Sequence, residues 1–171
     1  MAHLMRSKSD FAQDAVSTPE RSVRSVSGIF DETEVRDTFR ISYLANSLVL
    51  PVYDDIKRDH GLSRGEYLLI FCLSYSEELT AQDVADITGR PRNSISRAVH
   101  RMLQDGYLTR SPDPDDGRQA LLRITPKGRR LHQQIVPRFA EREGELLGVL
   151  SDDERRKLDQ LLAKLVSGGE A

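Results

Sequence analysis

The sequence predicts a mainly α-helical chain with a small β-hairpin wing, that is, a winged helix-turn-helix flanked by dimerisation helices. Three observations lead to this fold class. First, two short amphipathic helices are separated by a tight turn at Gly89. Second, two short strands follow, on either side of a turn rich in Pro, Asp and Gly. Third, longer helices with apolar stripes lie on both sides of this unit. A helix-turn-helix followed by a hairpin is the pattern of a winged helix.

The N-terminal part is predicted to contain an arm and two helices. Residues 1–34 are rich in Ser, Thr, Arg and Asp, so we expect a flexible arm. Apolar residues at mostly four-residue spacing predict a helix over about 33–59, with a kink at Pro51 because proline removes an amide donor. Ser63 with Glu66 forms a capping-box pair that opens the next, nearly all-apolar helix.

The remaining elements follow from caps and alternation. Thr80 and Gly89 bound a short helix. A second helix over 91–105 begins with a proline in its first turn, and its predicted buried stripe is Ile95, Val99, Met102 and Leu103. The stretches YLTRS and QALLRIT are short strands, and two further helices are expected over about 126–149 and from Ser151 onward.

We therefore expect two parts. The flexible arm covers 1–34, and one domain covers 35–171. Within that domain the winged helix-turn-helix occupies about 62–125, and the dimerisation helices occupy about 35–60 and 126–167.

The charge distribution indicates a nucleic-acid partner although the whole chain is slightly acidic. The 171 residues carry a formal net charge of −2. Residues 90–130 nevertheless hold ten basic and four acidic side chains, a net charge of +6, so the rest of the chain carries −8. A local excess of this kind is the electrostatic footprint of phosphate contact. The predicted partner is double-stranded DNA, and the alternative is a basic face that is merely solvated.

Composition argues against several other classes. No apolar run approaches the roughly 18–20 residues that span a bilayer, and no apolar segment follows the first basic residues, so we expect neither a membrane anchor nor a secretory signal. Cys72 is the single cysteine, which rules out an internal disulfide and suits the cytoplasm. No metal-ligand spacing and no phosphate-cradling glycine loop occurs, so we expect no metal and no cofactor.

The helix over 91–105 is the candidate DNA-reading element. With its apolar stripe turned inward, one set of polar side chains faces outward: Arg92, Asn93, Ser96, Arg97 and His100. Arginine and asparagine forks match guanine and adenine edges in the major groove. We expect Arg97 to read guanine, Asn93 to read adenine, and the helix N-terminus at Arg92 to meet a phosphate.

The Pro/Asp/Gly turn is the candidate wing. Its residue types pre-set turn geometry, and Arg118 is expected to leave the turn and enter the minor groove. Asp113 is expected to form the turn, and Asp116 to pair with Arg118 or with Arg101 and so hold the wing in shape.

The stretch over 79–128 resembles the core of the MarR family of bacterial transcriptional regulators. The family's wing signature falls on Asp113, Asp116, Arg118, Thr125 and Gly128. The likeness extends over roughly 35–166, and it implies a homodimeric repressor that a small molecule releases from a palindromic operator.

The resemblance also implies an effector pocket between the dimerisation helices and the winged part. Its ligand would be an aromatic acid, a phenolic compound or an acyl-CoA thioester. Its lining would be Tyr43, Ser47, Tyr53, Tyr67, Phe71 and His132, with an ordinary aromatic core as the alternative.

Three other functions remain as alternatives. Cys72 can make the chain a redox sensor, although its apolar neighbours predict a buried, inert thiol. A winged helix can also bind only protein. The stretch GLSRG over 61–65 matches a nucleophile elbow, but it follows a polar helix end rather than a strand, and Ser63 is already explained as an N-cap. We therefore expect the chain not to be an enzyme.

Overall fold

The computed structural model describes residues 28, 30, 33–114 and 119–168. The predicted arm lies almost wholly outside these residues. The chain separates by its contacts into a short unit ending at Arg40 and a larger unit beginning at Ile41. All of the packing and site geometry below belongs to the larger unit. Within the described part of the chain, no helix combines the length and apolarity that a membrane crossing requires.

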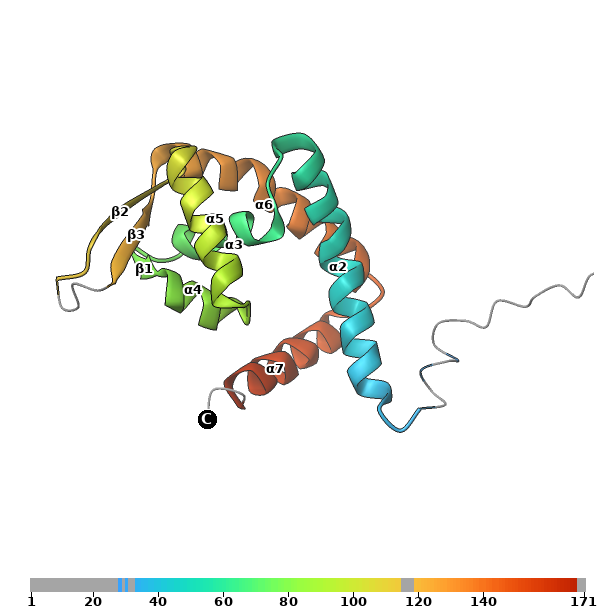
Figure 1. Ribbon diagram of the computed structural model, residues 1–171. Coiled ribbons are helices and arrows are strands. Elements are labelled where there is room, and N and C mark those ends of the chain that lie inside the picture. Colours follow the sequence, from blue (N-terminus) through green and yellow to red (C-terminus); the bar gives the residue numbers. More distant parts are fainter. Residues whose placement is uncertain (1–27, 29, 31–32, 115–118, 169–171) are drawn as a thin grey trace, which may run out of the picture. The chain divides into compact units, whose positions relative to one another are not determined.

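The order of elements agrees with the predicted winged helix-turn-helix (Figure 1). The elements are α2 (Arg36–His60), α3 (Arg64–Ser74), β1 (Leu79–Thr80), α4 (Ala81–Thr88), α5 (Arg92–Gln104), β2 (Leu108–Pro112), β3 (Ala120–Ile124), α6 (Pro126–Leu147) and α7 (Asp152–Gly168).

The sheet has three antiparallel strands in the order β1-β3-β2. Leu108 pairs with Ile124 in the hairpin, and Thr80 pairs with Leu121 across β1 and β3. The sequence analysis predicted the hairpin but missed β1, which is only two residues long. Figure 1 shows β2 and β3 projecting as a ribbon beside α4 and α5.

The predicted helix caps are confirmed. Ser63 and Glu66 form a reciprocal capping box at α3, with 2.6 Å between the Ser63 amide and the Glu66 carboxylate. Thr80 caps α4 together with Asp83. One boundary differs: α5 begins at Arg92, and the proline before it is the N-cap rather than a first-turn residue.

Helix α3 is the centre of the core. Its buried residues include Tyr67, Leu69, Ile70 and Leu73, and it packs against α5, α6 and β3. Its neighbours contribute further fully buried side chains: Ile56, Leu62, Val84, Ile95, Met102, Leu122 and Ile135. The turn between α4 and α5 is made at Gly89, whose φ of +61° favours glycine.

A close approach at the base of the hairpin explains the Thr-x-x-Gly pattern. The Thr125 hydroxyl accepts from the Gly128 amide at 3.2 Å and donates to the Tyr107 carbonyl at 3.0 Å. A Cβ on Gly128 would lie 2.6 Å from that same carbonyl and 2.7 Å from Ile124. Only glycine fits there, so this pattern fixes α6 against the base of β2 and β3.

Pro51 lies inside α2, and the structure shows where its missing hydrogen bond is replaced. Proline has no amide hydrogen, so the carbonyl of Ser47, one turn earlier, loses its helical donor. The Arg142 guanidinium of α6 donates to that carbonyl through Nε at 3.1 Å and Nη2 at 3.0 Å. The proline therefore creates an acceptor that joins α2 to α6.

These hydrogen bonds between Arg142 and the Ser47 carbonyl form a joint between α2 and α6, which predicts a coupling between two substitutions. Arg142→Met should lower the free energy of unfolding by about 1–2 kcal/mol, because the Ser47 carbonyl loses its donors. In a Pro51→Ala background the loss should shrink by at least about 0.5 kcal/mol, because the alanine amide donates to the same carbonyl. Urea denaturation of the four variants measures the coupling.

Glu145→Gln is the matched control. It removes the exposed ion pair between Arg142 and Glu145, 2.8 Å long, and leaves the Ser47 bonds in place. Its effect should be the same with and without the proline. Strictly additive losses for Pro51→Ala and Arg142→Met would contradict the joint.

Candidate nucleic-acid interface

Helix α5 presents the predicted polar face to the outside. All five predicted DNA-contacting side chains on it are exposed: Arg92, Asn93, Ser96, Arg97 and His100. The opposite side is buried at Ile95, Ala98 and Met102, while Val99 and Leu103 of the expected stripe are half-buried. The helix contains no acidic residue, so its outer face is cationic.

The N-terminus of α5 has no side-chain cap. Pro91 occupies the N-cap position and accepts, through its carbonyl, from the amides of Ser94 at 2.9 Å and Ile95 at 3.3 Å. The helix dipole places partial positive charge at this end, beside the Arg92 guanidinium. An anion such as a phosphate is therefore favoured here.

The described part of the wing holds one of its three predicted residues. The Asp113 amide donates to the Gln119 carbonyl at 3.2 Å, which closes the hairpin beyond β2. Asp116 and Arg118 lie outside the described residues, so their roles remain predictions. Arg123 of β3 pairs with Glu78 and so ties β3 to the segment before β1.

Arg101 is held by partners outside the wing. It was one of two arginines expected to pair with Asp116, which lies outside the described residues, so that pairing stays a prediction. Its guanidinium donates to Glu66 at 3.2 Å and to the Gly61 carbonyl at 3.1 Å, and it lies 3.5 Å from Asp105. The contacts with Glu66 and Gly61 join α5 to the α2–α3 junction, and Glu66 supplies a buried carboxylate on the adjacent helix.

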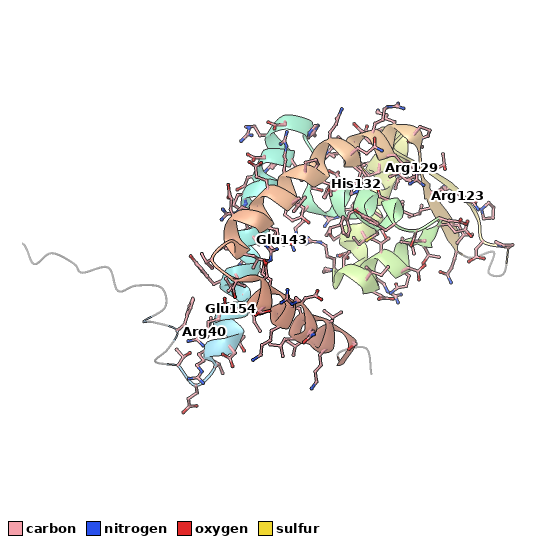
Figure 2. The ribbon with its side chains drawn as sticks, turned by 180° about the vertical axis from the view of Figure 1, so that it is seen from behind. Arg40, Arg123, Arg129, His132, Glu143 and Glu154 are labelled. Carbon is pink, nitrogen blue, oxygen red and sulfur yellow. The ribbon has the colours of Figure 1, made fainter. Side chains whose placement is uncertain are left out.

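Side chains from α2, α3, the α3 C-cap and α6 form an aromatic cluster. Its members are Tyr53, Tyr67, Phe71, Tyr75, His132 and Phe139. The Tyr67 ring stacks on Phe139 with centroids 5.4 Å apart, and its hydroxyl is hydrogen-bonded to Nδ1 of His132 at 3.3 Å. Figure 2 shows His132 on α6, close to the helices of the winged unit.

The cluster contains four of the six predicted pocket residues. Tyr43 is 46% exposed, and Ser47 uses its carbonyl for Arg142. Sequence reasoning missed Tyr75 and Phe139. The signal was present in Phe139, which stands four residues after Ile135 on one apolar stripe, but no periodicity shows which ring it meets.

Burial controls the protonation of the cluster. Burial lowers the pKa of His132, so the neutral ring that hydrogen-bonds Tyr67 is favoured. Burial also raises the pKa of Tyr67, to which the neighbouring phenols Tyr53 and Tyr75 add. The cluster is thus neutral and apolar in its interior.

Two arginines stand at the edge of this neutral cluster. Burial raises the pKa of Tyr53, and the Arg64 and Arg90 guanidinium groups act against that rise. Arg64 lies over the Tyr53 ring, 5.0 Å from its centroid. The Nε of Arg90 is buried, and among the described residues it has no hydrogen-bond partner. An aromatic surface beside two cations suits an aromatic anion.

A polar cleft of about 440 Å³ lies elsewhere, between α2 and α6. Its lining comprises Pro51, Val52, Asp55, Arg58, Asp59, Arg138, Glu141, Arg142 and Glu145. None of the predicted pocket residues belongs to it. Most of its charges are paired, as in Arg58–Asp55 at 2.6 Å and Arg138–Asp59 at 2.7 Å.

Two alternative chemistries find little support. Cys72 is buried, and burial raises the pKa of its thiol, which disfavours the reactive thiolate. Ser63 is the α3 N-cap, and its hydroxyl accepts from the Glu66 amide at 3.4 Å. Among the described residues, no group of three or more His, Cys, Asp or Glu side chains converges to hold a metal ion.

Comparison with known proteins finds similarity to one family. The sequence profile of the MarR family matches residues 60–119. The HTH-type transcriptional regulator BilQ of Clostridium symbiosum is 27% identical over 111 residues, which cover 65% of this chain and 77% of that protein. Such relatives are named as transcriptional regulators, in agreement with the expectation that the chain is not an enzyme.

Solved structures show the same fold. A MarR transcriptional regulator from Methanosarcina mazei superimposes with a TM-score of 0.70 at 21% identity, covering 78% of this chain and 95% of that one. The PcaV regulator from Streptomyces coelicolor, solved in complex with its natural ligand, gives 0.63 at 23% identity, covering 82% and 96%. The chain is therefore similar in sequence to MarR-family transcriptional regulators, and it has the winged helix-turn-helix fold of that family.

Proposed function

We propose that this MarR-family regulator is a homodimeric repressor that binds a palindromic DNA operator through α5 and the wing and is released by a small aromatic anion. The observation that carries the proposal is the outer face of α5. Five polar side chains lie exposed on one side of a helix whose other side is buried, and that helix carries no acid. Because such a protein acts on DNA, its place of action is the cytoplasm.

The chemistry of this face favours base reading over phosphate contact alone. Arg97 and Asn93 project from the middle and the N-terminal turn of the helix, where a recognition helix meets base edges. Their forked donors match guanine and adenine. The uncapped N-terminus beside Arg92 suits a phosphate, which would set the register of the helix in the groove. Arg118, in the wing, would add a minor-groove contact.

The homodimer is supported by apolar surface that one chain leaves exposed. Helix α7 has no buried residue, although it carries Leu161, Leu162, Leu165 and Val166, which are 51–67% exposed. Helix α2 likewise exposes Ile41, Leu44 and Leu50. A second copy that covers these faces would stabilise both helices. It would also present two α5 helices to successive major grooves, about one helical turn apart.

The effector proposal rests on the aromatic cluster and its two arginines. An aryl carboxylate would stack on the rings and place its charge near Arg64 and the unpaired Nε of Arg90. The PcaV regulator binds a natural ligand in a similar fold. Since the cluster joins α2 and α6 to α3, a ligand that prefers one arrangement of these helices would shift the population away from the DNA-binding spacing.

The alternative is a winged helix that binds only protein. The cationic face of α5 disfavours this alternative, because such a face attracts the phosphates of DNA. Binding to DNA must weaken steeply with salt, whereas a protein surface shows no such counterion release. A fluorescence-anisotropy titration at two salt concentrations distinguishes the two functions.

The first prediction concerns Arg97. Arg97→Ala should weaken binding to a duplex selected by the wild-type protein from a random-sequence pool by about 1–3 kcal/mol and should relax the preference at one base pair. Competition binding with single-base variants measures this. Arg156→Ala, on the outer side of α7, is the control and should change neither quantity. Equal weakening on all duplexes would instead assign Arg97 to a phosphate.

The second prediction concerns the dimer. Leu165→Glu should give monomers at micromolar concentration in sedimentation velocity, because the carboxylate would be buried in the proposed interface. Gln160→Glu adds the same charge on the opposite side of α7 and should leave the dimer intact. A stable dimer in both variants would exclude α7 from the interface.

The third prediction concerns the effector. Benzoate or a substituted benzoate should raise the Tm of the wild-type protein and lower its affinity for the selected duplex. At a ligand concentration of 100 Kd the stabilisation should reach about 2.7 kcal/mol. Arg90→Gln should reduce this shift, whereas Arg130→Gln, on the exposed side of α6, should not. Ligand binding that leaves DNA affinity unchanged would contradict release by the effector.

A further inference from the structure

We propose that Arg101 is a positioning residue for DNA recognition: it locks α5 onto the α2–α3 junction and thereby fixes the direction in which the reading face points. The proposal rests on the proposed DNA-reading function of α5. It assigns to Arg101 no contact with DNA. Its role is exerted through Glu66 and Gly61, which hold the helix in place.

The contacts of Arg101 determine the orientation of α5 because they come from two directions. Nη1 donates to both carboxylate oxygens of Glu66, at 3.2 and 3.3 Å. Nη2 donates to the carbonyl of Gly61 at 3.1 Å. The guanidinium is planar and its donors have fixed directions, so simultaneous contact with two elements restricts both the rotation and the position of the side chain.

The main partner of Arg101, Glu66, is itself buried and hydrogen-bonded. Glu66 is 5% exposed and stands in the first turn of the buried helix α3. Its Oε2 also accepts from the Ser63 amide at 2.6 Å, so the same carboxylate caps α3 and holds Arg101. A buried carboxylate needs a compensating cation, and removal of that cation leaves a costly charge. The pair is therefore a rigid point of attachment rather than a flexible surface bridge.

The junction that receives Arg101 is also attached to α6. Asp59, near the end of α2, accepts from Arg138 of α6 at 2.7 Å. Its pKa is held below the ordinary value by hydrogen bonds from Arg138 and Arg58. The segment from Asp59 to Glu66 is thus held by α6 on one side and by α5 on the other. Through Arg101, the position of the reading face follows the position of the proposed dimerisation helices.

The place of Arg101 on α5 suits this role. It stands one turn after Arg97, at the border between the buried stripe and the outer face. Its side chain is 48% exposed, so the alternative role for Arg101 is direct contact with a DNA phosphate. The two assignments differ in what happens when Glu66 is changed, because Glu66 is buried and cannot touch DNA.

The first test measures position directly and needs no DNA. Nitroxide spin labels are attached at Ser96→Cys on α5 and Gln134→Cys on α6 in a Cys72→Ala background, and the labelled chain is diluted with unlabelled chain. The distance distribution between the labels should broaden or shift in Arg101→Lys and in Glu66→Gln. It should stay unchanged in Asp105→Asn, which removes only the 3.5 Å contact within α5. Unchanged distances in both of the first two variants would overturn the proposal.

The second test measures recognition. The probe is a duplex selected by the wild-type protein from a random-sequence pool, compared with the same duplex after a one-base-pair change in half-site spacing. Arg101→Lys and Glu66→Gln should each lose about tenfold of the preference for the original spacing, about 1.4 kcal/mol, and keep the salt dependence of wild type. Asp105→Asn should keep the full preference.

Two results of the second test would overturn the proposal. A further variant, Arg101→Met, removes the charge. If Glu66→Gln keeps the spacing preference while Arg101→Met lowers the salt slope by about one, Arg101 contacts a phosphate. If both variants lower the Tm but keep the preference, Arg101 has only a structural role. If the wild-type protein selects no duplex, the proposed DNA function fails, and the label distances still decide whether Arg101 positions α5.

Discussion

The burial of α3 is the constraint on which the rest of the structure depends. Seven of its eleven residues are buried, and α5, α6 and β3 all pack on it. A helix surrounded in this way must find partners for every polar group that it carries. Glu66 finds Arg101 of α5 and the Ser63 amide, while the Tyr67 hydroxyl finds His132 of α6. Glu66 and Tyr67 are adjacent in the sequence, and their contacts attach α5 and α6 to the same buried helix.

This arrangement has a consequence for regulation. The aromatic cluster and the Arg101 attachment share α3, so a ligand that moves the rings around Tyr67 acts next to the carboxylate that holds α5. A close-packed interior transmits such a displacement rather than absorbing it. The proposed effector site and the proposed reading face are then connected by one helix. The ligand would change the relative populations of two arrangements of that helix and its neighbours.

Two helices expose apolar faces that a single chain does not cover. Helix α7 buries none of its residues despite its leucines, and α2 leaves large apolar side chains in solvent. A helix in a protein gains most of its stability from packing of its apolar face. Within one chain, the exposed apolar faces of α2 and α7 lack such packing. The Pro51 joint to Arg142 holds α2 against α6 while leaving those faces outward. In the proposed homodimer, a second copy of the chain would cover these faces.

The sequence by itself determined the features that depend on near neighbours. Capping pairs such as Ser63 with Glu66, the glycine turn at Gly89 and the exposed face of α5 could be predicted, because caps and helical periodicity are local. The tertiary structure decided the features that depend on distant partners. Strand β1 is two residues long and exists only because β3 pairs with it, and the pair between Arg101 and the buried carboxylate of Glu66 joins residues 35 apart in the chain. The physical reason is that hydrogen bonds and ion pairs are satisfied in space, and a sequence shows which groups need partners but not which distant groups meet them.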